Sequence, residues 1–326
     1  IYFSINVTPI FEIKETFTHK NLEMGIGGGV TLSFSKEEYN PSIPYSTSIN
    51  GFVTPQHIKI IGQCQKHSKR FHVNFSNGND IVFHFDVRFN EKCVVRNSTE
   101  DGRWQEEERF ENSFPFHHGK IFTLDFIANE DNVECRYDGQ FFTEFTYRNR
   151  HTDVKSMSIE GDVELHYFRD TLIPTYDHIP KESYSIQPRD YFFPTVKFAT
   201  ALNGYRFPMH VRIIGKCPEK GDRFEVNFVT NKDVAFHFNP RFKEKVVVRN
   251  NTIDGKWQHE ERTPKGNPFK KEKVFILDFY AQQTHVIAKL DNIEIASFAF
   301  RSSPSSIVGL EIQGEIELYL VTISNI

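Results

Sequence analysis

The sequence predicts an all-β protein made of two β-sandwich domains in tandem, and three features of its 326 residues support this. Runs of alternating apolar and polar residues recur at intervals of roughly 8 to 12 residues, as strands do in a sandwich. Many of the 33 phenylalanines fall in these runs, where alternate side chains would fill one core. The pattern then occurs a second time, and the chain is too long for one ordinary core.

The repeat has a constant register. Trp104 and Trp257 lie 153 positions apart, and at this offset residues 41–168 match 194–321 without an insertion or deletion. A repeat of this length is a domain, because solenoid repeats span only about 20 to 50 residues. We therefore expect a first domain over 37–170 and a second over 188–326.

The segments outside the two copies are less regular. Residues 171–187 carry two prolines in a polar setting, which favours a semi-extended linker. In residues 1–36, "IGGGVTLSFS" (26–35) resembles "IEGDVELHYF" (159–168). We predict that 1–36 is the C-terminal remnant of a preceding copy whose front is missing, and an unrelated β-rich arm is the alternative.

Charge and composition narrow the class of partner. A net charge of -4 without a basic cluster argues against nucleic acid, whose phosphates require concentrated lysine and arginine. No apolar run approaches the ~20 residues that cross a bilayer, so membrane insertion is not expected. No histidine and cysteine cluster has the spacing of a metal site, and no cofactor is predicted.

The four cysteines predict free thiols. Only Cys64 and Cys217 occupy matching positions in the two copies, whereas structural bridges would recur in both. Free thiols indicate synthesis in a reducing compartment.

The second copy presents a row of polar side chains. In "FHFNPRF", His237, Asn239 and Arg241 alternate with residues that would turn to the core. Asn250 ends the next strand. After a turn at "TIDGK", we expect a third strand with Trp257 at its entry or beside a bulge, followed by two charged residues on one face, Glu260 and Arg262.

These residue types suit a sugar. Tryptophan offers a flat apolar platform for the C–H face of a pyranose. Asparagine donates and accepts hydrogen bonds, arginine presents a planar fork, and glutamate accepts and orients arginine. Galactose has an axial 4-hydroxyl, which leaves its opposite face free to stack. Nothing in the set is arranged to cleave a bond.

The segments "HFNPRF", "VVRN" and "WQHEER" resemble the signature of the galectins, a family of β-galactoside-binding lectins, and the likeness extends over nearly all of 41–326. The resemblance implies jelly-roll sandwiches, calcium-independent binding, synthesis in the cytoplasm and export without a signal peptide. It also implies that His237, Asn239 and Arg241 contact the galactose 4-hydroxyl. The remaining contacts would be to the 6-hydroxyl, the ring face and the neighbouring sugar, made by Asn250, Trp257, Glu260 and Arg262.

The first copy departs from this pattern at Asp86 and Val87, where asparagine and proline are usual. Aspartate cannot donate a hydrogen bond, its charge must be paired with Arg88 or His84, and valine lacks the fixed φ of proline. We expect the first site to be weaker or altered in specificity. The residues it keeps are His84, Arg88, Asn97, Trp104, Glu107 and Arg109.

Two unequal sites on one chain predict a bivalent lectin that cross-links glycoconjugates on glycoproteins or glycolipids. N-glycosylation patterns begin at Asn97 and Asn250, both candidate sugar contacts, and synthesis in the cytoplasm would spare them.

The sequence leaves two other functions open. Glu106, Glu107 and Glu108 suggest a glycosidase pair, but the second copy has His259 in place of Glu106, so we expect no enzyme. The first copy could instead be a protein-interaction module that has lost sugar binding.

Overall fold

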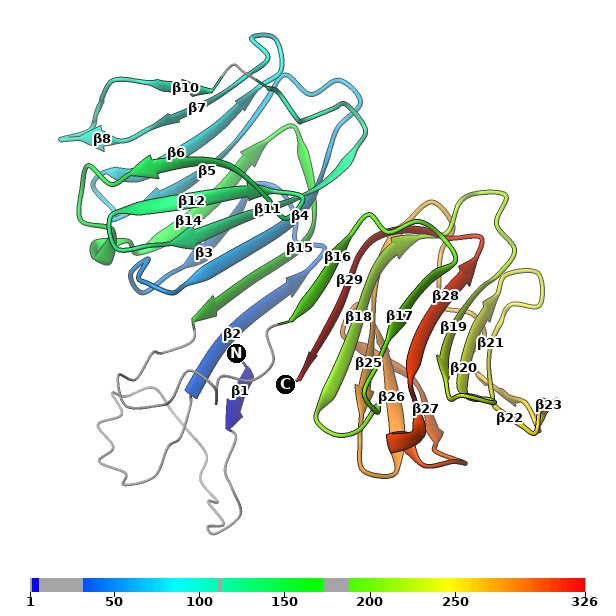
Figure 1. Ribbon diagram of the computed structural model, residues 1–326. Helices are drawn as coiled ribbons and strands as arrows, with labels where there is room; N and C mark the ends of the chain where they lie inside the picture. Colours follow the sequence, from blue (N-terminus) through cyan, green and yellow to red (C-terminus); the bar gives the residue numbers. More distant parts are fainter. Residues whose placement is uncertain (1, 6–31, 111–112, 173–187, 326) are drawn as a thin grey trace, which may run out of the picture. The chain divides into compact units, whose positions relative to one another are not determined.

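The computed structural model describes residues 2–5, 32–110, 113–172 and 188–325, and it divides into two compact units, 1–183 and 184–326. Each unit is a β-sandwich (Figure 1), which confirms the predicted fold class. Within the described residues, the helical turns are two short 3-10 segments, His151–Asp153 and Pro304–Ser306.

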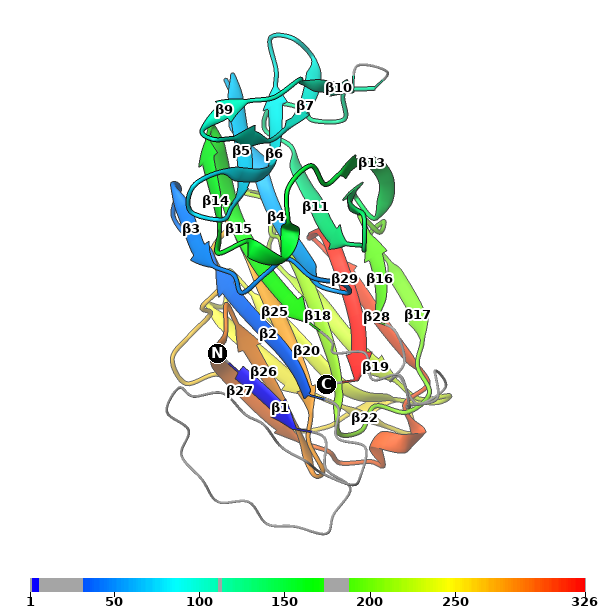
Figure 2. The ribbon, with the colours of Figure 1, turned by 90° about the vertical axis from the view of Figure 1, so that its left-hand side faces the viewer.

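The first sandwich consists of two antiparallel sheets. Figure 2 shows β5, β6 and β7 of one of them side by side, and we call this sheet the first site sheet. Its strand order is β10 (Glu108–Phe110), β7 (Cys93–Asn97), β6 (Ile81–Arg88), β5 (Arg70–Ser76), β14 (Ser156–Gly161) and β3 (Tyr45–Ser48). The opposite sheet has the order β1 (Tyr2–Ile5), β2 (Leu32–Tyr39), β15 (Val163–Leu172), β4 (His57–Cys64), β11 (Ile121–Ala128), β12 (Asn132–Tyr137) and β13 (Gln140–Thr146).

The second sandwich repeats this arrangement. Its site sheet has the order β17 (Phe198–Ala201), β28 (Gly309–Gly314), β19 (Phe224–Val229), β20 (Val234–Arg241), β21 (Val246–Asn250) and β24 (Glu261–Arg262). The opposite sheet has the order β16 (Arg189–Phe192), β29 (Glu317–Asn325), β18 (Met209–Lys216), β25 (Val274–Ala281), β26 (His285–Leu290) and β27 (Ile293–Ala299).

Phenylalanines fill both cores, as the alternating runs predict. Phe236 and Phe238 of β20 are buried in the second core, and Phe236 stacks on Phe298 of the opposite sheet at a centroid distance of 5.1 Å. Burying such aromatic side chains contributes about 1.5–3 kcal/mol each. Because one face of β20 is fixed in the core, its other face must carry His237, Asn239 and Arg241.

The segment before residue 37 contributes to the first sandwich. β2 starts at Leu32 and pairs with the final strand β15, with Glu38 opposite Phe168, and β1 pairs with β2. In the second sandwich β16 lies beside β29 in the matching register. The predicted remnant of an earlier copy stays a prediction, because residues 6–31 lie outside the described residues. Most of the predicted linker, 173–187, lies outside them as well.

The four cysteines, Cys64, Cys93, Cys135 and Cys217, are free, as expected, and all four are buried. Among the described residues no helix is long and apolar enough to span a membrane.

Candidate functional site

Three elements meet on the exposed face of the second site sheet. The pairing of β20 with β21 sets His237 opposite Asn250, and the pairing of β21 with β24 sets Val248 opposite Arg262. His237, Asn239 and Arg241 therefore share one face, as the alternation predicted.

Trp257 lies on a small hairpin beside this row. β22 (Thr252–Ile253) and β23 (Lys256–Trp257) pair through a tight turn in which Asp254 and Gly255 have positive φ of 50° and 70°. The indole is 55% exposed, and its centroid lies 4.7 Å from that of the His237 ring. A flat apolar surface thus borders a row of hydrogen-bonding groups.

The prediction of one strand carrying Trp257, Glu260 and Arg262 is wrong. β23 ends at Trp257 and belongs to a separate two-stranded sheet, and β24 begins only at Glu261. The cause is a carboxylate from another turn: Asp233 Oδ1 accepts hydrogen bonds from Gly255 N and Thr252 Oγ1, both at 2.8 Å. Asp233 draws the hairpin toward the β19–β20 turn and away from the ladder.

His237 and Asn239 are buried, and hydrogen bonds fix the orientation of both side chains. His237 Nδ1 lies 2.6 Å from Asn227 Oδ1, and burial lowers the pKa of His237 to about 4, so the ring is neutral at pH 7. With Nδ1–H donating to Asn227, Nε2 remains as an acceptor. Asn239 donates to Phe224 O at 2.6 Å and accepts from Arg241 Nε at 2.6 Å. One donor hydrogen and one lone pair of Asn239 remain for a ligand.

Glu260 is held between two arginines. Its carboxylate accepts from Arg241 NH2 at 3.2 Å and from Arg262 NH2 at 2.7 Å, and both arginines also contact Glu244. Partial burial opposes ionisation of Glu260, but the arginines outweigh it and lower its pKa. A single exposed ion pair contributes little to stability, but this network fixes the direction of an ionised acceptor.

Asn250 completes the site. It is buried, donates to Gln258 O at 2.8 Å and accepts from Asn251 N at 2.9 Å, which leaves one hydrogen and one lone pair. All seven predicted residues of the second copy are therefore brought together.

The first copy has the same layout. Trp104, on the hairpin of β8 (Thr99–Glu100) and β9 (Arg103–Trp104), is 53% exposed and lies 4.7 Å from His84 between ring centroids. His84 is opposite Asn97 in the β6–β7 register. Glu107 accepts from Arg88 and Arg109, at 2.7 Å from each.

Asp86 takes two arginines as partners. Its carboxylate, which has no exposed surface, accepts from Arg70 Nε at 2.7 Å and from Arg88 Nε at 2.6 Å, with His84 Nε2 3.8 Å away. Burial opposes its ionisation, but His84 and the two arginines outweigh this and hold its pKa well below the ordinary value. The expected pairing with Arg88 is present. Val87 faces the core, so its effect on the site is limited to the backbone.

Sequence reasoning missed Arg70. In the β5–β6 register Arg70 lies directly opposite Arg88, and Asp86 binds both of them. The second copy has the same cross-strand pair, Arg223 and Arg241, with Asn239 in place of the aspartate, so the signal in the sequence is Asp86 itself. Asn74 and Asn227, which orient the histidines, were missed too.

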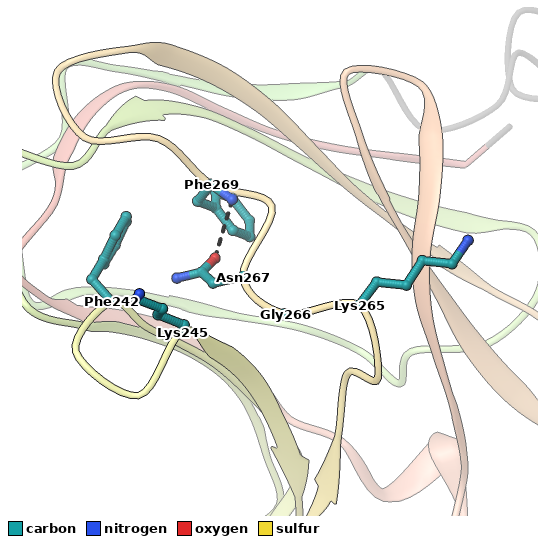
Figure 3. A pocket seen from close by; sticks show the side chains of 6 residues that line it. All are labelled: Phe242, Lys245, Lys265, Gly266, Asn267 and Phe269. Carbon is teal, nitrogen blue, oxygen red and sulfur yellow. Dashed lines mark hydrogen bonds between the residues drawn. The ribbon is translucent and has the colours of Figure 1, made fainter.

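The second sandwich also has a hollow between the β20–β21 turn and the segment that follows β24. It is lined by Phe242, Lys245, Lys265, Gly266, Asn267 and Phe269 (Figure 3), none of them a candidate sugar contact. Asn267 Oδ1 accepts from Phe269 N at 3.1 Å, and Lys265 extends away from the other side chains in Figure 3. Within the described residues, no group of three or more histidine, cysteine, aspartate or glutamate side chains is placed to hold a metal.

Comparison with known proteins gives one family. The family model described as "Galactoside-binding lectin" matches residues 44–169 and 197–323. The "32 kDa beta-galactoside-binding lectin" of Haemonchus contortus is 32% identical over 86% of this chain and 95% of its own length. "Galectin-4" of Homo sapiens is 31% identical over 87% of this chain and 96% of its own.

A solved structure, that of the Caenorhabditis elegans galectin LEC-6, is 34% identical and covers 41% of this chain and 94% of its own, with a TM-score of 0.40. The matched relatives are lectins rather than enzymes. Two matches to the family model, together with identity of at least 30% to relatives over most of the chain, show that this chain belongs to the galectin family of galactoside-binding lectins, with two galectin domains in tandem.

Proposed function

We propose that the chain is a calcium-independent lectin with two β-galactoside sites of unequal strength, and that it cross-links glycoconjugates. One observation carries the proposal: an exposed indole lies beside a row of hydrogen-bonding groups, once in each sandwich. Both sites are open faces, which suits the end of a glycan chain rather than an enclosed small molecule.

In the second site each unused hydrogen-bonding group has a place on galactose. The C–H face of the ring stacks on Trp257, and the axial 4-hydroxyl meets His237 Nε2, Asn239 and Arg241. The 6-hydroxyl donates to Glu260 and accepts from Asn250, while Arg262 reaches the neighbouring sugar. The ionised state of Glu260 and the neutral state of His237 both supply acceptors at neutral pH.

In the first site Asp86 lacks the N–H donor that Asn239 has at the matching position of the second site. Both of its oxygens are occupied by arginine, and it has no hydrogen to give to a sugar hydroxyl. Losing one partner from a buried polar contact costs about 1–3 kcal/mol, which is roughly tenfold or more in affinity. We infer a first site that is weaker for lactose, or that prefers a substituted galactoside.

Calorimetric titration of the full chain with lactose tests the unequal sites. Trp257→Ala should remove the tighter class of sites, whereas Trp104→Ala should leave it intact. A tighter class that survives Trp257→Ala would contradict the assignment. Cross-linking is tested separately, as precipitation of a galactose-bearing glycoprotein that lactose reverses and that either tryptophan variant abolishes.

We also infer cytoplasmic synthesis with export that needs no signal peptide. Asn97 and Asn250 begin acceptor patterns for glycosylation, and each Nδ2 donates to a backbone carbonyl in the fold. An attached glycan would displace these bonds and block both sites. Mass spectrometry of native material should find both asparagines unmodified, and a glycan on Asn250 would refute the inference.

A further inference from the structure

An arginine outside every sugar-contact motif lies behind the site in each sandwich. Arg301 follows β27, the edge strand of the opposite sheet, and reaches across to β24, the edge strand of the site sheet. Arg148 follows β13 and reaches toward β10 in the same way in the first sandwich. Each arginine bridges the two sheets along one open side of its sandwich.

The contacts of Arg301 converge on the segment that carries the sugar residues. NH1 donates to His259 O at 3.1 Å and to Asn251 Oδ1 at 3.0 Å, and NH2 donates to Glu261 Oε1 at 2.7 Å. His259 and Glu261 are the two chain neighbours of Glu260. Asn251 adjoins Asn250 and immediately precedes the hairpin that ends at Trp257.

Arg301 is itself held firmly. Its guanidinium carbon lies 4.8 Å from the ring centroid of Phe298, and its side chain is 27% exposed. Glu261 is also held from its other side by Arg249, with Arg249 NH2 3.6 Å from Oε2. Glu261 and Glu260 thus point to different partners: Glu261 to this arginine pair, and Glu260 to the sugar face.

The first sandwich repeats the arrangement with one change. Arg148 NH1 donates to Glu106 O at 2.8 Å and NH2 to Glu108 Oε1 at 2.7 Å, with Phe145 4.9 Å from the guanidinium carbon. Its third contact, at 3.2 Å, is to the Oδ1 atom of Asn97, itself a candidate sugar contact.

We propose that Arg148 and Arg301 are positioning residues for the sugar sites, each setting the place of the tryptophan platform and of the glutamate that follows it. A guanidinium suits this role because its planar fork can bind a main-chain carbonyl and a carboxylate at once, which an ammonium cannot do with fixed geometry. The inference rests on the proposed sugar binding for its affinity readout, but the geometry can be tested without sugar.

The chain has two tryptophans, one in each site, so fluorescence can report on a single site. In the full chain with Trp104→Ala, Trp257 is the only indole. Arg301→Ala in this background should shift the Trp257 emission to longer wavelength, increase its quenching by acrylamide, and weaken lactose binding about five- to thirtyfold. Arg301→Lys keeps the charge but loses the planar fork. Its Trp257 emission and its lactose affinity should lie between those of the parent and those of Arg301→Ala. Arg206→Ala, an exposed arginine of the same sandwich, is the matched control and should change neither readout.

The outcomes separate the alternatives. Wild-type emission and affinity within twofold in Arg301→Ala would overturn the proposal. Should Arg301→Ala fail to fold in thermal unfolding, Arg301→Lys decides, and wild-type behaviour of that variant would overturn the fork mechanism. If the Trp104→Ala parent does not bind lactose, the proposed function fails, while the emission comparison still tests the positioning role.

A double-mutant cycle sharpens the result. If Arg301 acts through Glu261, the losses of affinity in Arg301→Ala and Glu261→Ala should not add in the double variant. Additive losses would mean that Arg301 and Glu261 act independently, and would contradict the proposal that Arg301 acts through its ion pair with Glu261.

Discussion

On β20 of the second sandwich and β6 of the first, corresponding side chains take different partners. Asn239 donates to the backbone carbonyl of Phe224, whereas Asp86, with no hydrogen to donate, turns the matching oxygen to Arg70. The arginine two positions further along the strand is bound alike in both sandwiches, through Nε of Arg241 or Arg88. A change of one atom, nitrogen to oxygen, is thus accommodated by an arginine from the neighbouring strand without altering the layout of the site.

The hydrogen-bond capacity left for a ligand does change. Asn239 retains one donor and one acceptor, and Asp86 retains acceptor capacity only. Asn97 of the first site is also engaged by Arg148, while Asn250 of the second is not engaged by Arg301, which contacts Asn251 instead. The two sites therefore differ in the hydrogen-bonding groups available to a sugar rather than in layout: the first lacks a donor at Asp86 and a free lone pair at Asn97.

The largest effect is expected from placing the first site's residue in the second. Asn239→Asp should weaken lactose binding at the second site by roughly tenfold or more, because one buried donor is lost. Titration of the full chain with Trp104→Ala measures it. Arg223, the counterpart of Arg70, is available to pair the new carboxylate, so unfolding should change much less than affinity. Unchanged affinity would show that the asparagine donor is not used.

The reverse exchange should act more weakly. Asp86→Asn, measured in the Trp257→Ala background, should strengthen lactose binding at the first site by about tenfold at most, since the donor returns but Val87 still lacks the φ restriction of proline. Adding Val87→Pro to Asp86→Asn should recover part of the affinity difference from the second site that is left. If Asp86→Asn binds lactose no better than its parent, or less well, then Asp86 is not the cause of a difference in lactose affinity between the two sites.

Much of this site was predictable from sequence, and the reasons are local. Alternation along β20 places His237, Asn239 and Arg241 on one face whatever the rest of the chain does, and the constant register carries the assignment to the first copy. Arg70 was not predictable from the motif, because its contact depends on which strand pairs with β6. The separate hairpin of Trp257 was missed because Asp233, which draws it away, belongs to a turn far from it in the sequence.

Arg70 gives a smaller effect that bears on folding. Arg70→Ala leaves Asp86 with one arginine partner, and because Arg70 is half exposed we expect the unfolding free energy of the first sandwich to fall by about 1–2 kcal/mol. Chemical denaturation of the full chain, followed by Trp104 emission in the Trp257→Ala background, measures this. Asp86→Asn should suppress most of the loss. The matched control is Arg223→Ala in the second sandwich, followed by Trp257 emission in the Trp104→Ala background. It removes an exposed arginine with no such carboxylate and should stay within about 0.5 kcal/mol of its own parent.

The smallest effect concerns a feature the two copies share. Asp233 and Asp80 hold the tryptophan hairpins, and the backbone N–H of Gly255 or Gly102, with a threonine hydroxyl, lowers the pKa of each carboxylate. A lowered pKa means that the ionised form stabilises the fold. Its contribution is therefore complete above the ordinary carboxyl value of about 4 and is lost as pH falls through the lower folded value.

Asp233→Asn should consequently weaken lactose binding at the second site only about two- to threefold, because the amide oxygen still accepts from Gly255 and Thr252, while the charge and the longer hydrogen bond from Asp254 N to Oδ2 are lost. In the Trp104→Ala background the parent's Trp257 emission should stay constant from neutral pH down to about pH 5 and change below about pH 4. The variant should show its altered emission already at neutral pH and a smaller change on acidification than the parent, because His237, whose pKa is about 4 and whose ring lies 4.7 Å from the indole, titrates in both. Equal acid sensitivity of parent and variant would mean that another group controls the hairpin, and the same test on Asp80→Asn would show whether the first copy shares that group.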